Sequence, residues 1–290
     1  MKNLLLLFLI SSLFYACSSV PITGRSQLNL VSDQEVLALS LQQYDDYIKT
    51  AKKSTNKEST ALVVKVGSKI AEAVALYFQA VGMEELLKDY SWEFNLVDDS
   101  QANAFCMPGG KIVVYSGILP ICQNEAGLAV VLGHEVGHAI AKHANERMSQ
   151  QIALNAGSEV FGSLLNNSSE KVKTISSVVY GLGSQVGVML PFNRKQELEA
   201  DRLGLILMSI AGYDPNVAIP FWQRMGASGG GTIEFLSTHP SDATRVKEIE
   251  KYLPEAMEYY DAIWNSGKQT PSGTNSTNTP KAGSSTEWRF

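Results

Sequence analysis

The stretch VVLGHEVGHAIAKH, residues 130–143, contains three of the four histidines in the chain and a glutamate between the first two. Residues four apart on an α-helix lie one turn apart on the same side, so His134 and His138 could bind one metal ion together. Glu135 would lie close enough to take a proton from a water molecule that the ion polarises. The spacing therefore predicts a hydrolytic site with Zn²⁺ as its cofactor, one ion per chain.

The alternative is a buried helix that is merely rich in histidine. Gly133 and Gly137 leave room around the two ligands, and the remaining faces of the helix are apolar, so its buried histidines need partners. Both features favour the metal site. His143 is expected to be structural or to support a ligand from behind. A metzincin would have its third histidine at position 144, and the residue there is alanine.

A third ligand must come from another segment, and PFNRKQELEAD offers two carboxylates. Asn193 and Gln196 have the spacing of a capping box, which predicts a helix start. Glu197 and Asp201 then lie one turn apart on one face of that helix. Glu197 could complete a site of two histidines and one glutamate, and Asp201 could accept a hydrogen bond from a ligand histidine. A solvated pair beside two neighbouring arginines is the alternative.

Helices and a small sheet are expected to position these residues. Ser32 and Glu35 form a second predicted capping box. The histidine helix is expected to run unbroken from its cap, Asn124, to Met148. The expected helices cover residues 32–51, 58–80 and 124–148, and strands are expected within 90–99 and 102–119 with PGG as a hairpin turn. Further helices are expected as far as Trp264, one of them starting at Asp214-Pro215. The predicted fold is α+β, mainly α-helical, in a single domain over residues 33–265.

The first 16 residues have a cationic start and a short apolar run, which predicts a secretory signal. The run is shorter than the roughly 20 residues that span a bilayer. FYAC resembles a bacterial lipobox, so Cys17 is expected to carry lipid and residues 17–32 to form a lipidated tether and lead-in. These features predict a lipid-anchored protein of the bacterial cell envelope, facing the periplasm, with the outer membrane favoured over the inner.

Three other regions have simpler interpretations. Residues 266–290 are rich in Ser, Thr, Gly and Pro and are expected to be disordered. The aliphatic stretch 175–192 is expected to be a buried helix or a cover of the cleft rather than a membrane span. Cys106 and Cys122 could form a disulfide or remain as free thiols. The net charge of −5, without a long basic run, argues against nucleic acid as a partner.

HEVGH, NRKQELEAD and STHPSDATR follow one another in this order. They resemble the zinc metallopeptidase family of the CAAX prenyl protease and HtpX (metallopeptidase family 48). Within that family the chain is most similar to the soluble bacterial envelope lipoproteases of the BepA and LoiP kind. NAFCMPGGKIVVYSGIL and VPITGRSQLNLVS fit as well, so the resemblance covers roughly residues 20–264.

The resemblance implies a gluzincin-type domain with a small antiparallel sheet beside the active-site helix, and Glu197 as the third ligand. It also implies that the strand with Asn103, Ala104 and Phe105 pairs with the substrate backbone. His239, in the HP motif, would either bind the oxyanion or occupy the fourth metal position. Arg245 would be a second oxyanion donor.

The expected function is a zinc-dependent endopeptidase, with Glu135 as general base, that removes misfolded or misassembled envelope proteins. Its partners would be unfolded or extended polypeptides and a membrane reached through the lipid anchor. The rival is a non-proteolytic chaperone or assembly factor with a latent zinc site. The chain lacks the multiple membrane spans of the prenyl proteases and the C-terminal helical repeats of BepA. Neither prenylated substrates nor the same partners are therefore implied.

Overall fold

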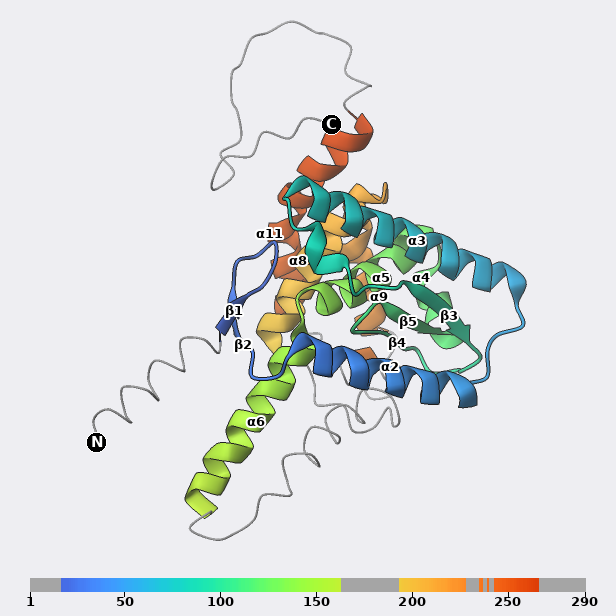
Figure 1. Ribbon diagram of the computed structural model, residues 1–290. Helices are drawn as coiled ribbons and strands as arrows, with labels where there is room; N and C mark the ends of the chain where they lie inside the picture. Colours follow the sequence, from blue (N-terminus) through green and yellow to red (C-terminus); the bar gives the residue numbers. More distant parts are fainter. Residues whose placement is uncertain (1–16, 163–192, 228–234, 237–238, 240–242, 266–290) are drawn as a thin grey trace, which may run out of the picture.

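The computed structural model describes residues 17–162, 193–227, 235–236, 239 and 243–265 (Figure 1). The predicted signal segment, the aliphatic stretch that precedes the second capping box, and the C-terminal tail lie outside the described residues. Among the described residues, no helix is both long and apolar enough to cross a membrane.

The two N-terminal helices begin at polar caps. Helix α2, Asp33–Thr50, starts at the predicted capping box, in which Ser32 and Glu35 bond reciprocally to each other's backbone. Helix α3, Lys57–Ala80, starts at Asn56, whose side chain accepts from the N–H of Ser59. Both predicted helices are confirmed to within a residue or two.

The sheet has three strands in the order β3-β5-β4. Strands β4 (Ala104–Met107) and β5 (Lys111–Tyr115) form the predicted antiparallel hairpin. Strand β3 (Glu93–Val97) pairs with β5 in parallel, so the sheet is mixed and not purely antiparallel as expected. β4 follows β3 in the sequence but does not pair with it, because β5 lies between the two strands. β4 is therefore an edge strand. Gly109 and Gly110, with φ of 89° and 84°, make the hairpin turn possible.

Helices α5 (Glu125–Ile140) and α8 (Arg194–Ile210) cross at the centre of the molecule (Figure 1). They approach closely because glycine faces glycine at the crossing. A Cβ added to Gly133 would lie 2.8 Å from the carbonyl oxygen of Gly204. These glycines thus allow α8 to pack closely against the part of α5 that carries the histidines. This role is more specific than the predicted one, which was to leave room around the ligands.

The histidine helix is shorter than predicted. It ends at Ile140, and a separate helix, α6 (His143–Gly162), continues in a new direction. Lys142 has a φ of 56°, in the left-handed region, which breaks the expected run to Met148. Figure 1 shows α6 extending away from the centre of the molecule.

Residues 17–32 are not a loose tether. Strands β1 (Cys17–Ser19) and β2 (Ser26–Leu28) form an antiparallel hairpin. Val20 is buried in the main core, and the turn between the strands meets helices α6 and α8 through side-chain contacts described below. Lipidation of Cys17 stays a prediction.

The other described elements complete the helical layers around α5 and α8. Asp214 caps a 3₁₀ turn that leads into the predicted helix. Cys106 and Cys122 are both free thiols. The remaining elements are η1 (Glu84–Leu87), η2 (Ser116–Ile118), α4 (Leu119–Cys122), η3 (Pro215–Val217), α9 (Ala218–Ala227), α11 (Ala243–Tyr260) and the π-helical turn η4 (Asp261–Asn265). The architecture confirms the predicted α+β, mainly helical class.

Candidate metal centre

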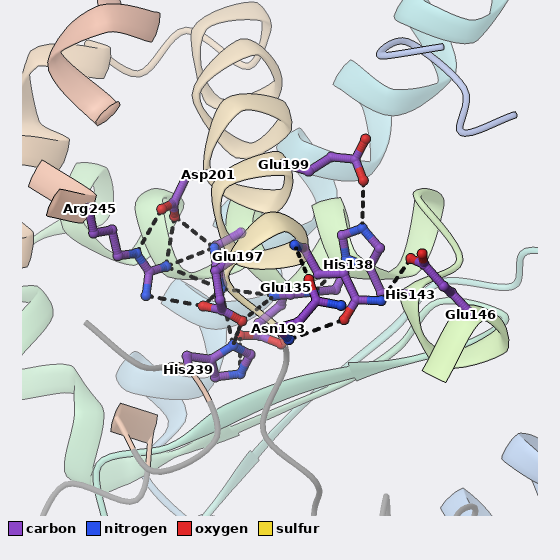
Figure 2. A network of polar contacts seen from close by, with 12 residues as sticks. Glu135, His138, His143, Glu146, Asn193, Glu197, Glu199, Asp201, His239 and Arg245 are labelled. Atoms are coloured by element: carbon purple, nitrogen blue, oxygen red, sulfur yellow. Dashed lines mark hydrogen bonds and ion pairs between the residues drawn. The ribbon is translucent and has the colours of Figure 1, made fainter. Parts of the chain in front are cut away.

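Four buried side chains from three parts of the chain converge on one point. His134 and His138 come from α5, Glu197 from α8, and His239 from the segment before α11. Their nearest ligand atoms all lie within 4.8 Å of one another. Figure 2 shows His138, Glu197 and His239 directed toward this point. The residues predicted as ligands are therefore brought together.

The ring nitrogens of His134 have distinct roles. Its Nδ1 lies 2.8 Å from Oδ1 of Asp201, and both side chains are buried. Burial lowers the pKa of His134 to about 4, so the ring is neutral, while Arg245 and His134 lower the pKa of Asp201 in spite of its burial. The carboxylate can only accept, so Nδ1 carries the proton and Nε2 presents a lone pair to the cluster.

The tautomer of His138 is fixed in a similar way, through the intermediate residue His143. Nε2 of His143 lies 2.9 Å from Oε2 of Glu199, and Nδ1 of His143 lies 2.7 Å from Nδ1 of His138. Burial lowers the pKa of both histidines, so both rings are neutral. His143 donates from Nε2 to Glu199 and accepts at Nδ1, so His138 donates from Nδ1. Its Nε2 is then also a lone pair.

These two lone pairs face each other at close range. Nε2 of His134 and Nε2 of His138 are 3.0 Å apart. In the tautomers set by Asp201 and His143, neither nitrogen has a proton to donate to the other. Two opposed lone pairs are repulsive alone and favourable on either side of a cation. Two imidazoles and one carboxylate form the donor set that suits Zn²⁺. The residues present therefore fit a metal ion.

Glu197 supplies the negative charge of the cluster. Its two carboxylate oxygens lie 3.3 Å and 3.5 Å from Nε2 of His138 and of His134. Burial raises its pKa, but the neighbouring His239 and the other histidines outweigh this effect and hold the pKa well below its usual range. Its Oε2 is buried and has no hydrogen-bond partner among the described residues. An ionised oxygen in this position is a suitable metal ligand.

His239 lies against the ligands and is not an exposed loop residue. Its Nδ1 is 3.0 Å from Oε1 of Glu197 and 3.2 Å from Nε2 of His134. Its ring stacks on Phe235 at a centroid distance of 4.5 Å. Burial lowers the pKa of His239, but the carboxylates of Glu197 and Glu135 prevail and raise it. His239 therefore lies among the ligand atoms, a position that suits either of the two roles expected for it.

Glu135 faces a groove beside the cluster. Burial raises its pKa to about 7, in spite of the nearby His239, and the backbone N–H of Cys106 donates to it. Its Oε1 lies 3.4 Å from Nε2 of His239 and makes no hydrogen bond among the described residues. A carboxyl group with a pKa near neutrality can both take and return a proton.

The groove runs along the edge strand of the sheet. Residues 103–108, with Asn103, Ala104 and Phe105 among them, line it together with Glu135, His138 and His239. The strand predicted to bind substrate and the predicted base therefore line the same groove.

Arg245 does not line this groove, although it was expected to donate to an oxyanion. It is buried behind the ligands, where Nε and Nη2 both bond to Asp201 at 2.7 Å. Its guanidinium lies 3.5 Å from the ring centroid of Trp222, and Nη1 is 3.2 Å from Oε2 of Glu197. Arg245 is therefore placed to hold Asp201 and Glu197 and not to contact a substrate carbonyl.

Sequence reasoning predicted a supporting role for His143 but missed the side chains that hold His143 in place. Glu199 and Arg25 both belong to this support. Both stand in stretches already recognised as motifs, NRKQELEAD and VPITGR, which is the one signal that could have identified them. No pattern of spacing links residues so far apart along the chain.

A buried His-Glu-x-x-His helix that receives a glutamate from a second helix defines a metallopeptidase of the gluzincin type. The chain belongs to peptidase family M48, whose family model matches residues 67–253. This confirms the predicted resemblance and supports a metal-dependent endopeptidase.

Several characterised proteins are similar to the chain. Mitochondrial metalloendopeptidase OMA1 of Saccharomyces cerevisiae is 32% identical over 272 residues, 90% of this chain and 76% of that protein. The protein of the same name from Schizosaccharomyces pombe is 41% identical over 174 residues, 59% of this chain and 49% of its own length. The Beta-barrel assembly-enhancing protease of Yersinia pestis is 31% identical over 163 residues, 54% of this chain and 33% of that protein.

These comparisons correct one expectation. The relatives that match most of the chain are named as mitochondrial proteins, and the bacterial protease matches over a shorter stretch. The prediction of a location in the bacterial envelope, facing the periplasm, is therefore wrong. The lipobox resemblance at Cys17 gave rise to it, and the residues before Cys17 lie outside those the structure describes. The chain spans about half the length of the Schizosaccharomyces relative.

Proposed function

We propose that the protein is a zinc-dependent endopeptidase that cleaves extended segments of unfolded polypeptides. One observation carries the proposal: Glu135, whose pKa is raised to about 7, stands in a groove between the lone-pair nitrogens of the cluster and an open strand edge. A structural metal site would have no use for a carboxyl group in that position. The groove supplies a base, a metal site and a surface for peptide backbone together.

The edge strand offers its backbone to the groove. The N–H of Tyr115 donates to the carbonyl of Asn103 at 3.0 Å, so Asn103 faces β5. Backbone groups alternate along a strand, which turns those of Ala104 and Cys106 away from β5. The bond from the N–H of Cys106 to Glu135 agrees with this direction. The N–H of Ala104 also points away from β5 and donates to Oδ1 of Asn103, so a substrate that adds to β4 as a further strand would replace these two bonds. A folded segment cannot add in this way.

The side chains then have separate tasks in hydrolysis. Bound Zn²⁺ would lower the pKa of a water molecule toward about 7 and polarise the peptide carbonyl. Glu135 takes the proton of the attacking water and returns it to the leaving amine. Asp201 and His143 hold the two ligand imidazoles in their tautomers. Arg245 fixes Asp201 and neutralises part of the buried negative charge.

His239 carries the second half of the proposal, a latent resting state. Its Nδ1 lies among the ligand atoms of the other three residues, where it would exclude a substrate. This observation also favours the rival function, a non-proteolytic chaperone or assembly factor with the same closed site. Displacement of the His239 side chain separates the two, because only the peptidase gains activity from it.

The test compares cleavage of unfolded casein by zinc-loaded wild type and His239→Ala. We expect slow cleavage by wild type and cleavage about tenfold faster or more in the variant, which corresponds to about 1.4 kcal/mol for displacing the side chain. A metal chelator should stop both reactions and added zinc should restore them. No casein cleavage by either zinc-bound protein would support the non-proteolytic function. Slower cleavage by His239→Ala than by wild type would show that His239 stabilises the oxyanion and would contradict the latent resting state.

A further inference from the structure

We propose that Arg25, in the turn between β1 and β2, is a positioning residue of the metal centre that acts on His138 through Glu199 and His143. The inference rests on the proposed metal site and extends it to the N-terminal segment. The segment would then belong to the functional site although it lies outside the groove.

Arg25 joins two helices through their carboxylates. Its Nη1 and Nη2 each donate to Glu146 of α6 at 2.8 Å, and its Nε donates to Oε2 of Glu199 of α8, also at 2.8 Å. Thr23, from the same turn, donates to the other oxygen of Glu199. Both carboxylates are buried, and the Arg25 side chain is 26% exposed. The single guanidinium therefore keeps two buried negative groups side by side and fixes how each of them points.

Glu199 is linked to the metal-ligand residue His138 through His143. Oε2 of Glu199, the oxygen that Arg25 holds, accepts from Nε2 of His143 (Figure 2). His143 in turn accepts at Nδ1 from Nδ1 of His138 over 2.7 Å. If Glu199 rotated away, nothing would fix the proton of His143 on Nε2. The alternative tautomer of His143 would move the proton of His138 to Nε2, the atom that must bind the metal.

The break between α5 and α6 makes this relay possible. In a continuous helix, His143 would lie more than a full turn beyond His138 and on another side. The left-handed Lys142 instead turns the chain so that His143 faces back to His138. The position of α6 thus determines whether the relay is intact.

Arg25 also controls the approach of α6 to α8. Its partner Glu146 also accepts a bond, at 2.8 Å, from Nε2 of Gln196, the residue before Glu197. The turn that presents Arg25 is closed by the backbone bond from Val20 N–H to the Arg25 carbonyl at 2.8 Å. Removal of the guanidinium would leave two buried carboxylates facing each other between α6 and α8.

The test measures zinc affinity and the visible absorption spectrum of the Co²⁺-substituted full chain. Arg25→Ala should bind zinc about 10–100-fold more weakly, the range typical of outer partners of metal ligands, and should shift the Co²⁺ spectrum. Added guanidinium ion should restore both. Arg202→Ala is the matched control. Arg202 lies on α8, as Glu199 does, and its Nε and Nη2 each donate to the carboxylate of Glu255 at 2.7 Å. This variant should leave both properties unchanged.

A second pair of variants keeps the proposal testable if Arg25→Ala does not fold. His143→Gln retains one acceptor and one donor, and His143→Leu retains neither, so the glutamine variant should bind zinc more tightly than the leucine variant. Zinc affinity and Co²⁺ spectra equal to wild type in Arg25→Ala, or equal affinities in the two His143 variants, would overturn the proposal. These measurements need no peptidase activity. If the endopeptidase proposal failed, no variant would cleave, but the affinity differences would remain.

Discussion

Glu135→Gln is expected to abolish most cleavage of unfolded polypeptide, by about 10²–10⁴-fold, and to leave metal binding unchanged. The amide has nearly the shape of the carboxyl group but cannot take a proton from water. Glu135 contacts the groove and is not among the four converging ligand residues, so the metal site itself should stay intact.

The measurement is the rate of casein cleavage, together with the zinc content of each preparation, in wild type and in the His239→Ala background. Glu250→Gln is a matched control, because it makes the same chemical change at an exposed position of α11. Cleavage by Glu135→Gln at the rate of its parent protein would show that Glu135 is not the general base. Loss of zinc from the same variant would instead make Glu135 a ligand.

The second large effect concerns the metal itself. Glu197→Ala is expected to weaken zinc binding by more than the roughly 10–100-fold that loss of an outer partner typically causes. It removes the only carboxylate among the converging ligand atoms, and it leaves Nη1 of Arg245 beside two imidazoles without the oxygen now 3.2 Å away. Arg245 keeps its pair with Asp201, but the cluster loses the negative charge of Glu197, so a second cation at the same place is less favourable.

Zinc content after dialysis against a weak chelator measures this effect. Glu255→Ala removes a half-buried carboxylate that pairs with Arg202 outside the cluster, so it should retain zinc. Cleavage should fall in proportion to the metal lost, and excess zinc should restore part of it. Wild-type zinc affinity in Glu197→Ala would show that the third ligand lies elsewhere.

Local signals in the sequence were sufficient to predict His134 and His138 as ligands and to offer Glu197 as a candidate, and the family resemblance was needed to choose it. The two histidines one turn apart predict a shared ion, and the box of Asn193 and Gln196 predicts where the second helix starts, which fixes the face that bears Glu197. These interactions depend on neighbours within one or two turns, so a pattern of spacing contains them. The family resemblance was needed to pair the two helices, because their crossing depends on glycine contacts between distant segments.

Features that depend on long-range packing could not be predicted. Lysine has no preference for the left-handed conformation that Lys142 adopts, so nothing in its neighbourhood indicated the end of α5. The parallel pairing of β3 with β5 depends on the path of the connecting chain. Arg25 stands in a polar, turn-rich segment that suggested a tether, and only the fold brings it to Glu146 and Glu199.

The most direct test of the account is a crystal structure of Glu135→Gln/His239→Ala with zinc and an unfolded-type peptide, recorded at the zinc absorption edge. We expect one anomalous peak bound by His134, His138 and Glu197, and the peptide added to β4 as a strand along the groove. A zinc peak elsewhere in the molecule, or a peptide bound away from β4, would contradict it.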